Sequence, residues 1–240
     1  MSKNTAPSRG RKLTVNVRTA RKRSPASAEW LRRQLNDPYV VAAKQQGWRS
    51  RAAFKLLELD DRFHVIRRDA RAVDLGAAPG GWTQVAIRRG AGTVVGVDLL
   101  AMDPIQGATL LTGDFNDPDM PARLTVVLGG KADLVLSDMA PNTTGHAATD
   151  HLRIMALAEL AAAFARDVLA PNGSFVAKVF QGGSERAMLE ALKRDFTSVR
   201  HAKPPASRSA PASKIAGAIR ISAHLLETLA RRGSGLSSRR

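Results

Sequence analysis

The pattern of apolar and polar residues changes character after Asp69. From there, short apolar runs typical of buried strands alternate with stretches whose apolar residues recur at helical spacing. The predicted strands cover 72–76, 93–98, 108–114, 132–138, 173–180 and 197–203, and the predicted helices cover 82–89, roughly 150–169 and 184–195. Alternation of this kind predicts an α/β fold, with a mainly parallel sheet and helices on both of its faces.

The stretch before the sheet, from Ala28 to about Asp61, has a helical pattern in two pieces. The first piece, EWLRRQLND, ends at the break Asp37-Pro38. The second starts near Ser50 and carries its apolar residues at Phe54, Leu56, Leu57 and Leu59.

The net charge of +16 is unusually high for 240 residues. Residues 1–28 contribute eight basic residues and no acidic one, which predicts a flexible basic arm. Solubility alone and an anionic membrane surface are alternative explanations, but a polyanionic partner, most often nucleic acid, is favoured.

The composition also excludes some classes of protein. The chain has no cysteine, so disulfides, thiolate zinc sites and cysteine nucleophiles are excluded. No signal peptide is visible, and the most apolar run, 155–165, contains Glu159 and is too short to span a bilayer. We therefore expect a soluble cytoplasmic protein that does not enter membranes.

Acidic residues stand at the ends of four successive predicted strands: Asp74, Asp98, Asp114 and Asp138. A single acid in such a place is often only a helix N-cap. Because the carboxyl ends of parallel strands lie at one edge of the sheet, these four acids would line that edge. Ligands of open α/β sheets bind there, beyond the carboxyl ends of the strands.

The glycine-rich loop between Gly76 and Gly81 lacks the G-x-G-x-x-G spacing that cradles a diphosphate. Asp98 nevertheless follows Asp74 at about the 20-residue spacing of an acid that holds ribose hydroxyls. An acidic edge without a diphosphate cradle favours a nucleoside with a neutral or positive tail, which S-adenosylmethionine (SAM) fits. Asp114 could then accept a hydrogen bond from the adenine amino group.

Lys178 lies within the apolar run SFVAKVFQGG (174–183), where burial of a charge is costly. It could be an edge-strand lysine that points to solvent. Alternatively, it could serve chemistry at the end of the strand.

Several segments together resemble the FtsJ/RrmJ (RlmE-type) family of SAM-dependent ribosomal RNA ribose 2′-O-methyltransferases. They are RSRAAFKLLELD (49–60), DLGAAPGGW (74–82), DLLAMDPIQG (98–107), GDF (113–115), SDMAPN (137–142) and FVAKVFQG (175–182). The resemblance implies a Rossmann-like methyltransferase fold, with a methyltransferase domain over 29–208.

The resemblance also implies roles for individual residues. The family's SAM contacts fall on Gly80, Trp82, Asp98, Asp114 and Asp138. Its catalytic lysine falls on Lys178, with Lys55 and Asp138 as partners, and no metal is implied. The implied substrate is a uridine of 23S rRNA in the assembled 50S subunit, and a monomer is favoured. Methylation of another RNA, or a SAM-binding assembly factor without catalysis, are the alternatives.

The resemblance stops after K-P-P-A-S-R (203–208). Ser213 occupies the position of a family glutamate, and the family's closing Tyr and Val-Ala-Thr-Gly strand is missing, which puts the last antiparallel strand in doubt. Either the tail, 209–240, is genuinely divergent, or the reading frame shifts near residue 209. Reading the coding DNA in the other two frames distinguishes these explanations.

Overall fold

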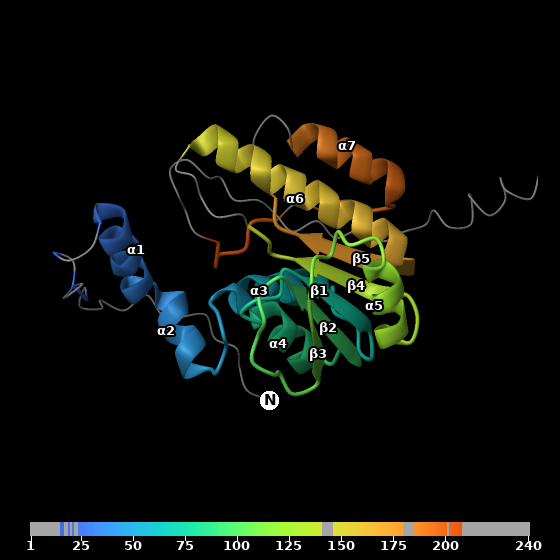
Figure 1. Cartoon of the computed structure of the whole chain (residues 1–240), viewed down its shortest axis with the longest axis horizontal. Helices are drawn as coiled ribbons and strands as arrows, with labels where there is room; N and C mark the ends of the chain where they lie inside the picture. Colours follow the sequence, from blue (N-terminus) through green and yellow to red (C-terminus); the bar gives the residue numbers. More distant parts are fainter. Residues whose placement is uncertain are drawn as a thin grey trace, which may run out of the picture.

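The computed structural model of the chain describes residues 15–16, 19, 21, 24–140, 146–179, 185–200 and 202–207. Its centre is a five-stranded sheet in the order β3-β2-β1-β4-β5, in which every pair of neighbours is parallel (Figure 1). The strands are β1 (Arg71–Leu75), β2 (Thr93–Asp98), β3 (Ala108–Thr112), β4 (Ala132–Ser137) and β5 (Leu169–Ala177). The predicted parallel sheet is therefore confirmed.

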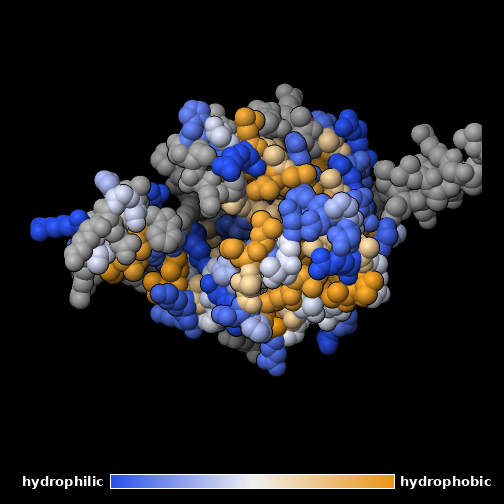
Figure 2. Space-filling model, viewed as in Figure 1, coloured by the Kyte–Doolittle hydropathy of each residue, from blue (hydrophilic) through white to orange (hydrophobic). Residues whose placement is uncertain are grey.

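Helices cover both faces of the sheet, as the alternating pattern predicts. One face packs against α5 (Met120–Leu128), α6 (Ala147–Val168) and α7 (Glu185–Asp195) through a core that includes Val73, Val95, Val135 and Phe175. The other packs against α2 (Pro38–Gln45), α3 (Ala52–Phe63) and α4 (Gly81–Arg88) through Ala72, Val94, Leu134 and Val176. Alternate residues of each strand thus serve opposite cores. On the face of the molecule shown in Figure 2, hydrophobic and hydrophilic residues both reach the surface.

The helical segment before the sheet has three pieces rather than two. Helix α1 (Pro25–Asn36) ends at Asp37, whose side chain then accepts a 3.0 Å hydrogen bond from the Tyr39 amide and caps α2. Helix α1 also takes in the last residues of the predicted arm. Most of the arm lies outside the described residues, and the whole tail from 209, with Ser213, lies outside them too. Both remain predictions.

Three other elements differ from the prediction. Helix α5 was not expected, although Pro121 in its first turn is a common start signal. Strand β5 begins at Leu169 and passes through Asn172, whose φ of 63° accompanies a shift in its register against β4. The strand predicted over 197–203 is wrong: among the described residues there, only Arg200 makes an isolated bridge.

The segment 202–207 docks against α3 instead. Glu58 accepts a 2.8 Å hydrogen bond from the Ala206 amide, and the Arg51 guanidinium donates to the Ala206 carbonyl oxygen. Arg51 also forms a 2.8 Å ion pair with Asp37. The backbone N–H and C=O groups of the buried Ala206 are thereby both hydrogen-bonded without a strand partner.

Candidate functional site

The carboxyl ends of the strands open into a cleft of about 650 Å³. Its lining includes three of the four predicted acids, Asp98, Asp114 and Asp138, together with the apolar side chains of Phe115 and Met139. Asp98 ends β2, Asp114 follows β3 and Asp138 follows β4. The structure therefore brings these acids together at one sheet edge, as expected for parallel strands.

The first two acids already order the loops around the cleft. The Asp98 carboxylate accepts hydrogen bonds from the Ala78 amide at 2.9 Å and from the Leu100 amide at 2.8 Å. Asp114 accepts from both the amide and the side chain of Asn116, at 2.9 and 2.8 Å. Because each carboxylate has about four lone-pair sites, both keep acceptor capacity for a ligand.

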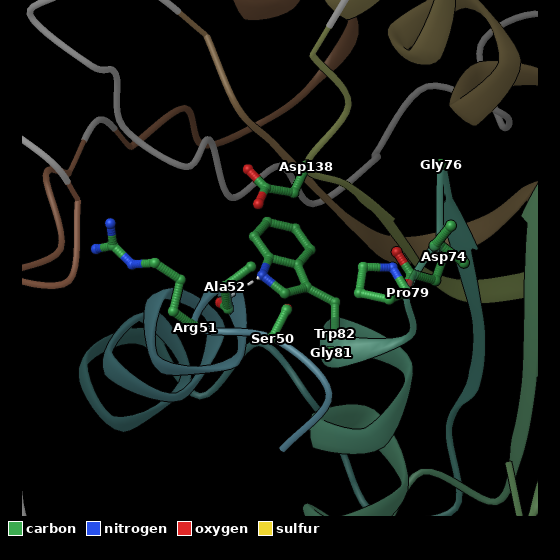
Figure 3. Close-up of a pocket in the computed structure, with 11 residues that line it drawn as sticks. Ser50, Arg51, Ala52, Asp74, Gly76, Pro79, Gly81, Trp82 and Asp138 are labelled. Carbon is green, nitrogen blue, oxygen red and sulfur yellow. Dashed lines mark hydrogen bonds between the residues drawn. The ribbon is translucent and has the colours of Figure 1, made fainter. Parts of the chain in front are cut away.

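A smaller recess of about 230 Å³ adjoins this cleft and shares Gly76, Ala78 and Asp138 with it. Figure 3 shows the Trp82 indole at its centre, next to the start of α3 and below Asp138. Trp82 is only 4% exposed, and its Nε1 donates a 2.8 Å hydrogen bond to the Ala52 carbonyl oxygen. Trp82 thus joins α4 to α3 as well as lining the recess.

Asp74 lines the same recess from within β1 rather than from its end. It is buried, and one carboxylate oxygen accepts a 2.7 Å hydrogen bond from the Thr83 hydroxyl. Burial raises the pKa of Asp74 to about 7, with the negative charges of Asp138 and Asp98 adding to the effect. Asp74 is therefore poised to hold a proton near neutral pH.

Lys55 and Lys178 converge on the Asp138 carboxylate. Lys55 Nζ lies 2.9 Å from each of its two oxygens. Lys178, the first residue after β5, has its Nζ 3.3 Å from Oδ1 and donates a 2.6 Å hydrogen bond to the Asp138 backbone oxygen. The three side chains are mostly buried, with 12–18% of their surface exposed. The predicted cluster of Lys178, Lys55 and Asp138 therefore exists in the fold.

Lys55 and Lys178 share the Asp138 carboxylate unequally, and this affects the pKa values of Asp138 and Lys178. Burial opposes ionisation of Asp138, but Lys55 and Lys178 together hold its pKa below the usual range. Burial lowers the pKa of the Lys178 ammonium, Asp138 opposes this shift, and the Lys55 charge adds to it. Since Asp138 is held by both of its oxygens to Lys55, it offsets the burial of Lys178 only in part.

Gly80 and Gly81 make room for protein side chains. A Cβ on Gly80 would lie 2.4 Å from Ile105 Cδ1 and 3.2 Å from Arg49 Cδ, and one on Gly81 would lie 2.2 Å from Ser50 Oγ. Gly80 is not among the described residues that line either recess. The side-chain faces of both glycines are thus occupied by neighbouring residues, and of the two only Gly81 lines the smaller recess.

Gly80→Ala should destabilise the fold by about 1–3 kcal/mol, because the new methyl group overlaps Ile105 and the φ of 105° disfavours any side chain. Gly129→Ala is a matched control, since Gly129 also has a positive φ, 67°, but nothing lies within 4 Å of its added Cβ. Urea unfolding of both variants measures the difference. Equal losses would show that the contact with Ile105 contributes nothing.

Other residues of the site had no signal in the sequence. Ser50 and Met139 line the recesses, but neither residue type suggests a ligand in isolation. Within the described part of the chain, no group of three or more His, Cys, Asp or Glu residues could hold a metal ion. The helices described there also include none that is both long and apolar enough to cross a membrane.

Comparison with known proteins agrees with this geometry. A family profile described as FtsJ-like methyltransferase matches residues 48–215. The ribosomal RNA large subunit methyltransferase E of Granulibacter bethesdensis is 70% identical over 202 residues, which cover 84% of this chain and 88% of that protein. The protein of the same name from Acidiphilium cryptum is 64% identical over 208 residues, which cover 87% of this chain and 92% of that protein.

A solved structure shares the fold as well. A Plasmodium falciparum protein described as a ribosomal RNA methyltransferase superimposes with a TM-score of 0.65 at 27% sequence identity, covering 73% of this chain and 99% of that one. The matched profile spans α3, the glycine loop, the acidic edge and Lys178. With the fold, the sheet-edge acids and the sequence matches in agreement, the chain belongs to the FtsJ-like methyltransferase family.

Proposed function

We propose that this protein methylates the ribose 2′-O of a uridine in large-subunit ribosomal RNA, with SAM as methyl donor, and that it acts on the assembled 50S subunit. The observation that carries the proposal is the cluster of Lys178, Asp138 and Lys55 beside the carboxyl-edge cleft. The names of the relatives at 64–70% identity support the class of substrate.

The two adjoining recesses fit the two ends of SAM. The larger one offers carboxylates at Asp98 and Asp114 for ribose hydroxyls and an adenine amino group, beside the apolar ring of Phe115. The smaller one is lined by the carboxyl groups of Asp74 and Asp138, which could serve as hydrogen-bond partners for the amino-acid end of SAM. Trp82 would contribute from the lining of this recess, and Gly80 through the turn that it makes before Gly81. When bound, SAM supplies an electrophilic methyl group.

Lys178 would act as the general base. A ribose hydroxyl is a poor nucleophile, and it must lose its proton as it attacks a methyl group. The lowered pKa of Lys178 favours the neutral amine that can accept this proton at Nζ. Its hydrogen bond to the Asp138 backbone oxygen fixes the position of Nζ, so that the hydroxyl would be oriented as well as deprotonated.

Lys55 and Asp138 would tune and place this base. The Lys55 charge disfavours a second ammonium nearby and so lowers the pKa of Lys178 further. Asp138 neutralises Lys55 through both carboxylate oxygens and borders both recesses. Asp138 would therefore contact the cofactor and the two lysines at the same time, because it lines both recesses.

The excess of positive charge, +16, is the expected property of a protein that works on ribosomal RNA. Contacts with phosphates would make binding to the 50S subunit fall steeply with salt concentration. A ribosomal substrate in turn implies a cytoplasmic location. The basic arm, 1–28, would add phosphate contacts outside the domain.

The proposal predicts methyl transfer from labelled SAM to 50S subunits, at a single uridine 2′-O that can be mapped by mass spectrometry of nuclease fragments. Free large-subunit rRNA and tRNA serve as parallel substrates. Transfer to tRNA but not to 50S subunits would identify another RNA as substrate. Binding of SAM without transfer to any of these RNAs would favour an assembly factor that has lost catalysis.

A further inference from the structure

The loop from Leu99 to Gly107 forms one wall of the cofactor cleft. Asp98, Leu99 and Leu100 line the 650 Å³ cleft on one side of this wall. Leu100 to Asp103 line a separate recess of about 480 Å³ on its other side, together with Arg49, Ala78 and Pro79. Leu99 and Leu100 are 69% and 68% exposed. The part from Leu99 to Asp103, with open space on both sides, therefore receives little support from packing, whereas Ile105 is buried beside Gly80.

Hydrogen bonds hold this wall at two points. At its start, Asp98 accepts the Leu100 amide at 2.8 Å. Midway along it, the Arg49 guanidinium donates to the carbonyl oxygens of Asp103 and Pro104, both at 2.7 Å. The same guanidinium reaches the Pro79 carbonyl oxygen at 3.4 Å. Arg49 thus connects the middle of the wall to the glycine-rich loop.

Arg49 is itself held in place. Its amide donates a 2.8 Å hydrogen bond to the side chain of Gln84 on α4, and Gln84 also donates to the Gly47 carbonyl oxygen at 3.2 Å. The stem of Arg49 passes beside Gly80, where a Cβ would lie only 3.2 Å from Arg49 Cδ. The absence of a side chain at Gly80 therefore allows Arg49 to reach across to the wall.

We propose that Arg49 is a positioning residue for the cofactor: it holds the 99–107 wall so that Asp98 and Leu100 stay in place for the adenosine end of SAM. The inference rests on the proposed use of SAM. Three carbonyl acceptors on two different loops require several donors in one rigid plane, which a guanidinium has and a lysine ammonium lacks. Arg49 acts through the wall and need not touch the reacting atoms.

Arg49→Met, which keeps the stem and loses the donors, should weaken SAM binding roughly tenfold or more by calorimetry, because hydrogen bonds to a charged group are lost. The maximal rate at saturating SAM should change much less than this affinity. Arg49→Lys should restore part of the affinity. Arg68→Met is the control, since Arg68 is 91% exposed, precedes β1 at the opposite sheet edge and carries the same charge.

Hydrogen exchange provides a readout that does not depend on SAM. In the ligand-free protein, the amides of 99–107 should exchange faster in Arg49→Met than in Arg68→Met. Equal exchange, equal SAM affinity in these two variants, or a loss confined to the KM for 50S subunits would each overturn the inference. A wild-type protein that binds no SAM would overturn the proposed cofactor as well, whereas normal wild-type binding with an unaffected Arg49→Met would overturn this inference alone.

Discussion

Lys178→Met should lower the rate of methyl transfer in a single turnover by about 10²–10⁴-fold while SAM affinity is retained, because general-base help contributes on that order. The methionine fills the space of the lysine stem but cannot accept a proton. Labelled SAM and 50S subunits in a rapid-quench experiment give the rate, and calorimetry gives the affinity. The loss should therefore appear in the chemical step and not in cofactor binding.

Two further variants distinguish the action of Lys178 as a base from an effect of its positive charge. Lys178→Arg keeps a cation that does not deprotonate in proteins, so it should be about as inactive as the methionine variant. If Lys178→Arg retained most of the rate, Lys178 would act by orienting the hydroxyl with a fixed charge. Lys131→Met controls for the loss of charge, since Lys131 is exposed and precedes β4 at the amino edge of the sheet.

Asp74→Asn should stabilise the protein at pH 8 by up to about 4 kcal/mol and have almost no effect at pH 4. Burial raises the pKa of Asp74 from 3.8 to about 7, so the folded protein binds one more proton than the unfolded chain between these pH values. The contribution of Asp74 to the free energy of unfolding therefore falls as pH rises from 4 to 7, and levels off above 7. Asparagine carries no charge and can still accept the hydrogen bond from Thr83.

Urea unfolding of both proteins from pH 4 to pH 8 measures this difference, and the subtraction cancels all groups that titrate in both. A difference that did not change with pH would contradict a protonated Asp74. Asp133→Asn is a control of opposite sign. Although burial opposes it, hydrogen bonds from Arg71 hold the pKa of Asp133 below its usual range, so this variant should lose most stability near neutral pH.

Much of the site could be predicted because parallel strands bring their carboxyl ends to one edge. Acids far apart in the chain, such as Asp98 and Asp138, had to lie near each other once the strands were placed. The convergence of Lys55 on Asp138 was implied only by the family resemblance, since nothing in the spacing of an α3 lysine points to a strand 83 residues away.

What could not be predicted depends on tertiary contacts with the backbone. Arg49 bonds to carbonyl oxygens 54 and 55 residues away, and carbonyls leave no mark in a sequence. Gly80 was assigned a role only through the family resemblance, and Ile105, which fills the space beside it, lies in another loop. The strand predicted over 197–203 reflected local propensity, which the packing of this region overrides.

Because the backbone amide and carbonyl oxygen of Ala206 are both hydrogen-bonded, the segment that follows can be exchanged as a separate unit. Arg51, which precedes α3, and Glu58 on α3 hold the backbone of Ala206, and Lys55 lies between them in the sequence. Whatever sequence follows Ser207 therefore departs from a fixed point next to the active-site helix. A chimera joined there, with the C-terminal segment of a relative grafted on, would keep the Lys55 geometry of this chain. Any change in its activity would then belong to the grafted segment.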